Sequence, residues 1–162
     1  MADHQLNEHI LSKITEKRIF TIRGQRVMLD SDLAELYQVK TKDINLSVKR
    51  NAERFPEEFM FQLTSNEHNE LNLRLQSATS SLGRHGGRRY PPHVFTEHGV
   101  AMLSSVLNSS RAIQVNIVII KTFIRLKQIV GNHSEIVKRL DALEKKSVGQ
   151  DHKITEIFQT IR

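Results

Sequence analysis

Residues 30–55, with the sequence DSDLAELYQVKTKDINLSVKRNAERF, predict two short helices joined by a tight turn. The second helix is predicted over 42–54, with Thr41 as its cap and Pro56 as its stop. The first helix has apolar residues at helical spacing, which are Leu33, Leu36 and Tyr37. Because helices of this length are not stable alone, the two must pack together on a common core.

The predicted helix over 42–54 has two faces of opposite character. At about 100° per residue, one face is mainly apolar and consists of Ile44, Val48, Asn51 and Phe55. The other face carries Lys, Arg and Asn, which reach the phosphates and base edges of DNA in the major groove. The residues expected near bases are Asn45, Lys49 and Arg50. Those expected near phosphates are Lys40, Lys42 and Arg54. An ordinary solvated helix also has a charged outer face, so the spacing alone leaves both interpretations open.

A second basic cluster lies in residues 77–92, SATSSLGRHGGRRYPP, which contain three glycines and two prolines. This composition predicts a loop or a long hairpin tip. Its arginines have no neighbouring acid, and they suit contact with a DNA backbone or minor groove. The residues expected to make that contact are Arg84, Arg88 and Arg89. The alternative is a surface loop without this function.

Strand and helix signals alternate along the chain, which predicts an α+β fold. Two strands around Gly24 predict an N-terminal β-hairpin, and further strands are predicted at 59–63 and 93–95. Gly131 is interpreted as a helix break, which predicts a compact domain over 1–131 and a separate helical tail over 132–162. Besides the helix-turn-helix-like pair, the predicted helices of the domain cover residues 4–17, 66–76, 97–107 and 110–130.

The tail predicts a coiled coil that joins copies of the chain. Its apolar residues alternate at spacings of four and three, with Ser147 and Gln150 as polar layers. The residues expected at this contact are Ile136, Leu140, Leu143, Ile154, Ile157 and Ile161. Since a solitary amphipathic helix gains little by folding alone, we expect a homo-oligomer. The alternative is a tail that folds back on the domain.

Composition excludes several classes of protein. The 162 residues include no cysteine, which excludes disulfides and favours a cytoplasmic location. The N-terminus lacks the apolar segment of a signal peptide, and the most apolar run, 113–120, is too short to cross a bilayer. The net charge of +6 favours an anionic partner.

The sequence does not predict an enzyme. His85, His93 and His98 lie close together, but they lack the spacing of a metal site. No motif places a nucleophile beside a base. We therefore expect no catalytic residue, no metal and no cofactor.

Three blocks of sequence resemble the KilA-N-type DNA-binding domain, in the branch named after a phage open reading frame. They are VMLDSDLAELY (27–37), NAERFPEEFMFQLT (51–64) and FTEHGVAMLSSVLNSSRA (95–112). The resemblance covers about residues 18–127, and the tail lies outside it. It implies a compact α+β fold and a DNA-binding role in phage or prophage regulation, such as transcriptional control or antirepression.

Together, these features predict a double-stranded-DNA-binding protein with an oligomerising tail. The main alternative is an adaptor that binds another protein, as an antirepressor could do without touching DNA. A nuclease ranks last, because no carboxylate cluster has metal-ligand spacing.

Overall fold

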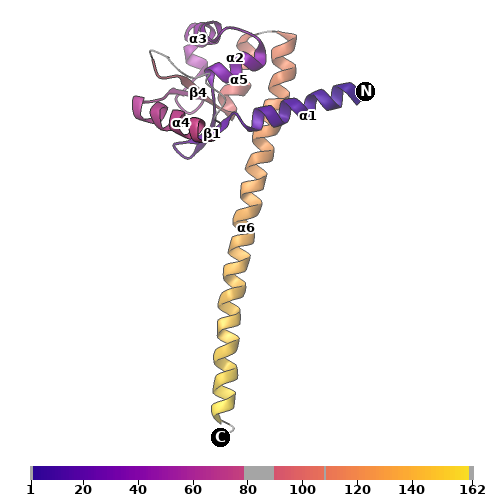
Figure 1. The fold of residues 1–162 in the computed structure, drawn as a ribbon, viewed down its shortest axis with the longest axis vertical. Coiled ribbons are helices and arrows are strands. Elements are labelled where there is room, and N and C mark those ends of the chain that lie inside the picture. The colour runs from indigo at the N-terminus through magenta and orange to yellow at the C-terminus, as the bar shows by residue number, and fades with distance from the viewer. Residues whose placement is uncertain (1, 79–89, 108, 161–162) are drawn as a thin grey trace. The chain divides into compact units, whose positions relative to one another are not determined.

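The computed structural model describes residues 2–78, 90–107 and 109–160 (Figure 1). Helices and strands are mixed in it, as expected for an α+β fold. The chain divides into two compact units, Met1–Phe123 and Ile124–Arg162. Strands and most helices belong to the first unit, and the division falls inside the last helix.

A four-stranded antiparallel sheet organises the first unit. Its strands are β1 (Ile19–Ile22), β2 (Gln25–Leu29), β3 (Met60–Gln62) and β4 (His93–Thr96), in the order β1-β2-β4-β3. The predicted N-terminal hairpin is confirmed, with Ile22 opposite Gln25 across a two-residue turn. Both turn residues, Arg23 and Gly24, have positive φ angles of 52° and 72°, which match the twist of a tight hairpin.

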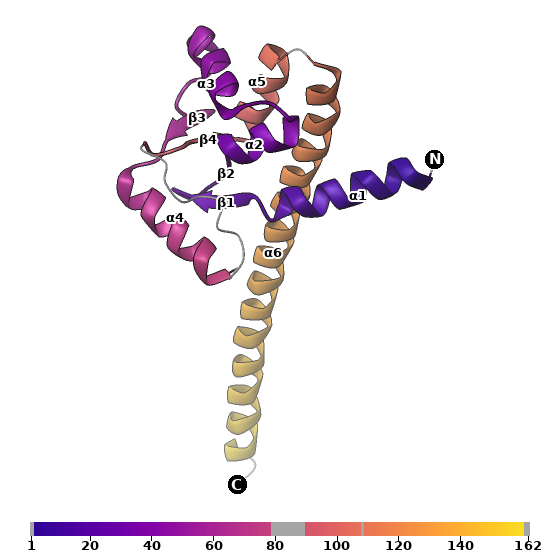
Figure 2. The same ribbon diagram turned by 45° about the horizontal axis from the view of Figure 1, so that its top comes forward.

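Side chains of β2 alternate between two separate cores. Met28 joins the larger core, formed with helices α2 (Asp30–Tyr37), α3 (Thr41–Arg50), α5 (Glu97–Leu107) and the first part of α6 (Ser110–Thr160). Its neighbours Val27 and Leu29 join the smaller core with Phe61 and with Leu71, which lies on helix α4 (Ser65–Ala78). This period of two follows from the pleat of a strand. Figure 2 shows the result, with α4 on one side of the sheet and α2 and α5 on the other.

The helices of the structure follow the predicted order. Their bounds are α1 (Ala2–Glu16), α2 (Asp30–Tyr37), α3 (Thr41–Arg50), α4 (Ser65–Ala78), α5 (Glu97–Leu107) and α6 (Ser110–Thr160). Several begin with side-chain caps. Thr64 and Glu67 bond each other's backbone N–H groups at the start of α4, at 3.2 Å and 2.8 Å. At the start of α6, Ser109 Oγ accepts a hydrogen bond from the Ala112 N–H at 3.1 Å.

Two helix predictions are wrong. The helix predicted over 42–54 ends at Arg50, and Arg54 lies on a separate 3₁₀ turn, Ala52–Arg54. Its cap is not Thr41, which is already helical; Lys40 precedes the helix without a capping side chain. The break predicted at Gly131 is also absent, because α6 continues to Thr160. One glycine costs a helix only about 1 kcal/mol, which a long run of helix-forming neighbours outweighs.

Candidate nucleic-acid interface

The turn between α2 and α3 fixes how the two helices meet. Gln38 adopts a left-handed conformation with φ of 58°, and its N–H donates to Glu35 O at 3.1 Å. The Val39 N–H donates to Ala34 O at 2.9 Å. Together these two bonds satisfy the last carbonyls of α2 and form a Schellman motif. The chain therefore reverses tightly here, as the sequence predicted for this pair.

The inner face of α3 is anchored in the larger core. Ile44 is fully buried, and Val48 and Phe55 are nearly so. Phe55 also meets Phe95 of the sheet edge-on, with ring centroids 6.2 Å apart. The predicted apolar face is thereby confirmed for these residues. Asn51 is half-buried, and its amide donates to Ser47 O at 2.8 Å.

The outer side of this segment is cationic. All five basic residues are exposed, namely Lys40, Lys42, Lys49, Arg50 and Arg54. Among the residues that the structure describes, none of the five forms an ion pair, even with the nearby Asp43 or Glu53. Lys49 and Arg50 occupy the last turn of α3, where positive charge also favours the helix dipole. We call these five residues the α3 basic face.

Asn45 differs from the other residues expected to contact DNA. It is half-buried, and its Nδ2 atom donates to Asp30 Oδ2 at 3.0 Å. Asp30 is itself buried at the start of α2. This bond therefore ties the start of α2 to the middle of α3. Asn45 has a positioning role within the protein, whatever it contacts outside.

A buried polar pair holds α2 against α5 and α6. The Tyr37 hydroxyl donates to Asn116 Oδ1, and Asn116 Nδ2 donates to Val100 O at 2.9 Å. Burial raises the pKa of Tyr37 well above its usual value, so the hydroxyl stays protonated as a donor. We call α2, α5 and the first part of α6 the platform on which α3 packs. Hydrogen bonds as well as apolar packing therefore hold this platform together.

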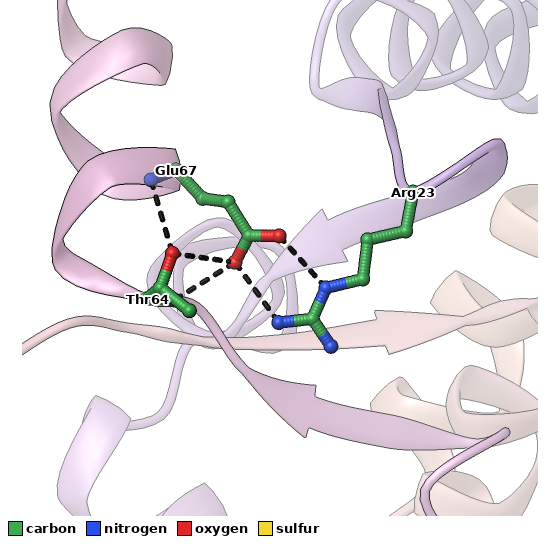
Figure 3. A network of polar contacts seen from close by, with 3 residues as sticks. All are labelled: Arg23, Thr64 and Glu67. Atoms are coloured by element: carbon green, nitrogen blue, oxygen red, sulfur yellow. Dashed lines mark hydrogen bonds and ion pairs between the residues drawn. The ribbon is translucent and has the colours of Figure 1, made fainter.

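A second polar network joins the turn of the N-terminal hairpin to the start of α4 (Figure 3). Arg23 of the hairpin turn makes two bonds to the Glu67 carboxylate, from Nε at 2.7 Å and from Nη2 at 3.0 Å. These bonds, with those from Thr64, lower the pKa of Glu67 to about 2. The Arg23 guanidinium also lies 4.4 Å from the centroid of the Phe61 ring. Its charge is used within the protein, unlike those of the α3 basic face.

Several predicted residues cannot be placed. Arg84, Arg88 and Arg89 lie outside the described residues, as does Ile161. Ile154 and Ile157 lie on α6, but only their backbone is described. The remaining residues of the predicted tail contact, Ile136, Leu140 and Leu143, are exposed.

The described residues contain no group of three His, Cys, Asp or Glu side chains that could hold a metal ion. No helix in the described part of the chain is long and apolar enough to cross a membrane.

Sequence reasoning missed two residues that shape this platform, Asp30 and Asn116. A signal for Asn116 was present, because it interrupts an apolar run and a buried polar side chain requires a partner. Asp30 gave no such signal, since an aspartate at the start of a helix is common in any case.

Comparison with known proteins identifies one family. The sequence model described as the ORF6N domain matches residues 17–106, which is more than half of the 162 residues. This range includes the sheet, α2, α3, α4 and most of α5. No curated protein and no solved structure matches the chain.

Proposed function

Because the chain belongs to the ORF6N domain family, a phage-type family, we propose that it acts as a KilA-N-type domain that binds double-stranded DNA. The proposed role is cytoplasmic regulation of phage or prophage genes, either by transcriptional control or by antirepression. Binding, without catalytic turnover, is the whole of the proposed activity.

One observation carries this proposal. The α3 basic face presents five exposed cations without an ion-pair partner among the described residues. Lys42, Lys49 and Arg50 lie on α3, whose other side is anchored in the core, whereas Lys40 precedes α3 and Arg54 lies on the following 3₁₀ turn. Contact between such cations and phosphates costs little free energy within the protein, because no internal ion pair has to break first. Arg18 and Arg23 differ from these five residues, because each of the two arginines forms an ion pair with a glutamate of the protein.

The proposed mechanism places α3 in the major groove. A helix fits that groove in width, and in this proposal Lys49 and Arg50 contact base edges. Lys40, Lys42 and Arg54 then contact phosphates on either side. Asn45 holds α3 on α2 through Asp30. From the sequence, we propose that Arg84, Arg88 and Arg89 contact the adjacent backbone.

The direct test removes two charges from the basic face. We expect Lys49→Ala/Arg50→Ala to weaken duplex binding at least tenfold, because one lost contact to a base edge is worth about 1–3 kcal/mol. The matched control is Lys13→Ala/Lys17→Ala, which removes the same charge from exposed residues at the end of α1 and just beyond it. Equal affinity of both variants in mobility-shift titrations would exclude α3 as the contact surface.

We further propose that α6 joins copies of the chain. Ile136, Leu140 and Leu143 are exposed, although their spacing of four and three is that of a coiled-coil seam. Two linked DNA-binding domains would raise each other's effective concentration on DNA. In the full chain, Leu140→Glu/Leu143→Glu should lower the mass measured by sedimentation equilibrium. An unchanged mass would place the contact elsewhere.

A second candidate function is protein adaptor. It is favoured by Ile113 and Ile117, which are exposed on the first turns of α6 while the opposite side of that helix is buried in the core. An exposed apolar pair of this kind suits a protein partner. An adaptor would retain its partner after nuclease treatment and lose it in Ile113→Glu/Ile117→Glu. It would be insensitive to Lys49→Ala/Arg50→Ala.

A further inference from the structure

Leu46 is the one residue of the outer side of α3 that does not fit a simple charged surface. Its side chain is 45% exposed. At about 100° per residue, it lies about 40° around the helix from Lys42 and about 40° from Arg50. Lys42 and Arg50 lie on opposite sides of Leu46, and Lys49 lies about 60° away on the side of Lys42. A large apolar side chain therefore stands at the centre of the α3 basic face.

The packing of α3 does not require Leu46. Ile44 and Val48 already supply the buried side of the helix, and both belong to the larger core. Asn45, which precedes Leu46, is held by Asp30, so the backbone at this position is fixed relative to α2. Leu46 is thus exposed at a defined place, with Lys42 and Lys49 on one side and Arg50 on the other, and with the exposed Asp43 beyond Arg50.

The chemistry of this arrangement indicates what Leu46 contacts. Phosphates attract the surrounding cations, but they give an apolar side chain nothing to bind. In the major groove, the apolar group on a base edge is the C5-methyl of thymine. We infer that Leu46 packs on a thymine methyl and makes the protein select thymine at one position of its DNA site. This inference rests on the proposed DNA binding by α3.

The test uses the full chain and a duplex selected by it from a randomised pool. Each thymine is replaced in turn by deoxyuridine, which removes only the methyl group. We expect one position at which the replacement weakens binding about fourfold, as for one buried methylene-sized group. In Leu46→Ala, deoxyuridine and thymine should bind equally at that position.

The control is Leu73→Ala on α4, which truncates another exposed leucine. It should retain the full penalty for deoxyuridine. Because Leu46 is half-exposed and alanine is a strong helix former, Leu46→Ala should keep the fold, and its circular dichroism spectrum checks this.

Either of two kinds of result would overturn the inference, the first seen with the wild type and the second with Leu46→Ala. One is a duplex that binds tightly and shows no penalty for deoxyuridine at any thymine. The other is a penalty that persists in Leu46→Ala, or a variant that loses affinity equally for both bases, as expected for a side chain wedged between base steps. If no duplex is selected at all, the proposed function fails before this inference is reached.

Discussion

The buried bond between Tyr37 and Asn116 supports α2 and, through it, the α3 basic face. Tyr37 is 2% exposed and Asn116 is 5% exposed. Replacing Tyr37 by Phe removes the hydroxyl and leaves Asn116 Oδ1 buried without its donor. Such an orphaned polar atom costs about 1–3 kcal/mol. We therefore expect Tyr37→Phe to lower the free energy of unfolding by about that amount.

Asn116→Ala should cost more than Tyr37→Phe. It leaves the Tyr37 hydroxyl without its acceptor, removes the side-chain donor to Val100 O, and also opens a small cavity. In the double variant, the Tyr37 hydroxyl is absent and so cannot be left buried without a partner. The double variant should therefore lose less free energy of unfolding than the sum of the two single variants, by about 1 kcal/mol.

Urea unfolding followed by circular dichroism measures these changes, with all four proteins compared at pH 7. Duplex affinity at a temperature where each variant is folded serves as a second readout, and it should be unchanged, because neither residue belongs to the basic face. The reasoning would be refuted by a Tyr37→Phe variant as stable as the wild type. It would also be refuted by strictly additive effects in the double variant.

Three further predictions concern the scaffold. Gly99→Ala should destabilise the protein by more than about 2 kcal/mol in urea unfolding, because a Cβ there would lie 2.0 Å from the backbone oxygen of Phe59; a stable variant would contradict this close approach. Gln38→Gly should raise the melting temperature, with a gain of up to about 1 kcal/mol, since its φ of 58° suits glycine; a lower melting temperature would contradict it. Bonds to Arg23 lower the folded-state pKa of Glu67 to about 2 from 4.5, so its contribution to stability is complete above about pH 4.5 and is lost as the pH falls toward 2. Acid titrations of Glu67→Gln should therefore show less loss of stability between pH 4.5 and 2 than the wild type, and an identical loss would refute this role.

Much of this fold could be predicted from local signals. The hairpin was predictable because Gly24 separates two β-rich segments, and the turn indeed uses positive φ angles. The apolar face of α3 followed from its spacing, since Ile44 and Val48 had to be buried together. Periodicity and turn chemistry are local properties, so the sequence displays them directly.

The sequence was less informative about element ends and about polar partners. α3 ends at Arg50, earlier than predicted, and α6 passes through Gly131. A single residue does not set either boundary: α6 continues because the helix-forming residues around Gly131 outweigh the cost of one glycine. The bond from Asn45 to Asp30 could not be foreseen for a different reason, since it joins residues of two helices whose contact depends on the fold.

The candidate site was predictable as a set of charges but not as an arrangement. The exposed positions of Lys42, Lys49 and Arg50 agree with their predicted side of the helix. The sequence could not show that these cations lack acidic partners among the described residues. Asp43 is close to them in sequence, and only the coordinates show that it forms no ion pair with them. The central place of Leu46 likewise gained its meaning only once its exposure was known.

The salt dependence of duplex binding tests the central claim most directly. If Lys40, Lys42 and Arg54 each neutralise one phosphate, the slope of log K against log salt should become less negative by about 2.7 in Lys40→Ala/Lys42→Ala/Arg54→Ala. Between 50 mM and 200 mM salt, wild-type affinity should then fall roughly 40-fold more than that of the variant. Identical slopes for the two proteins would contradict DNA binding by the α3 basic face.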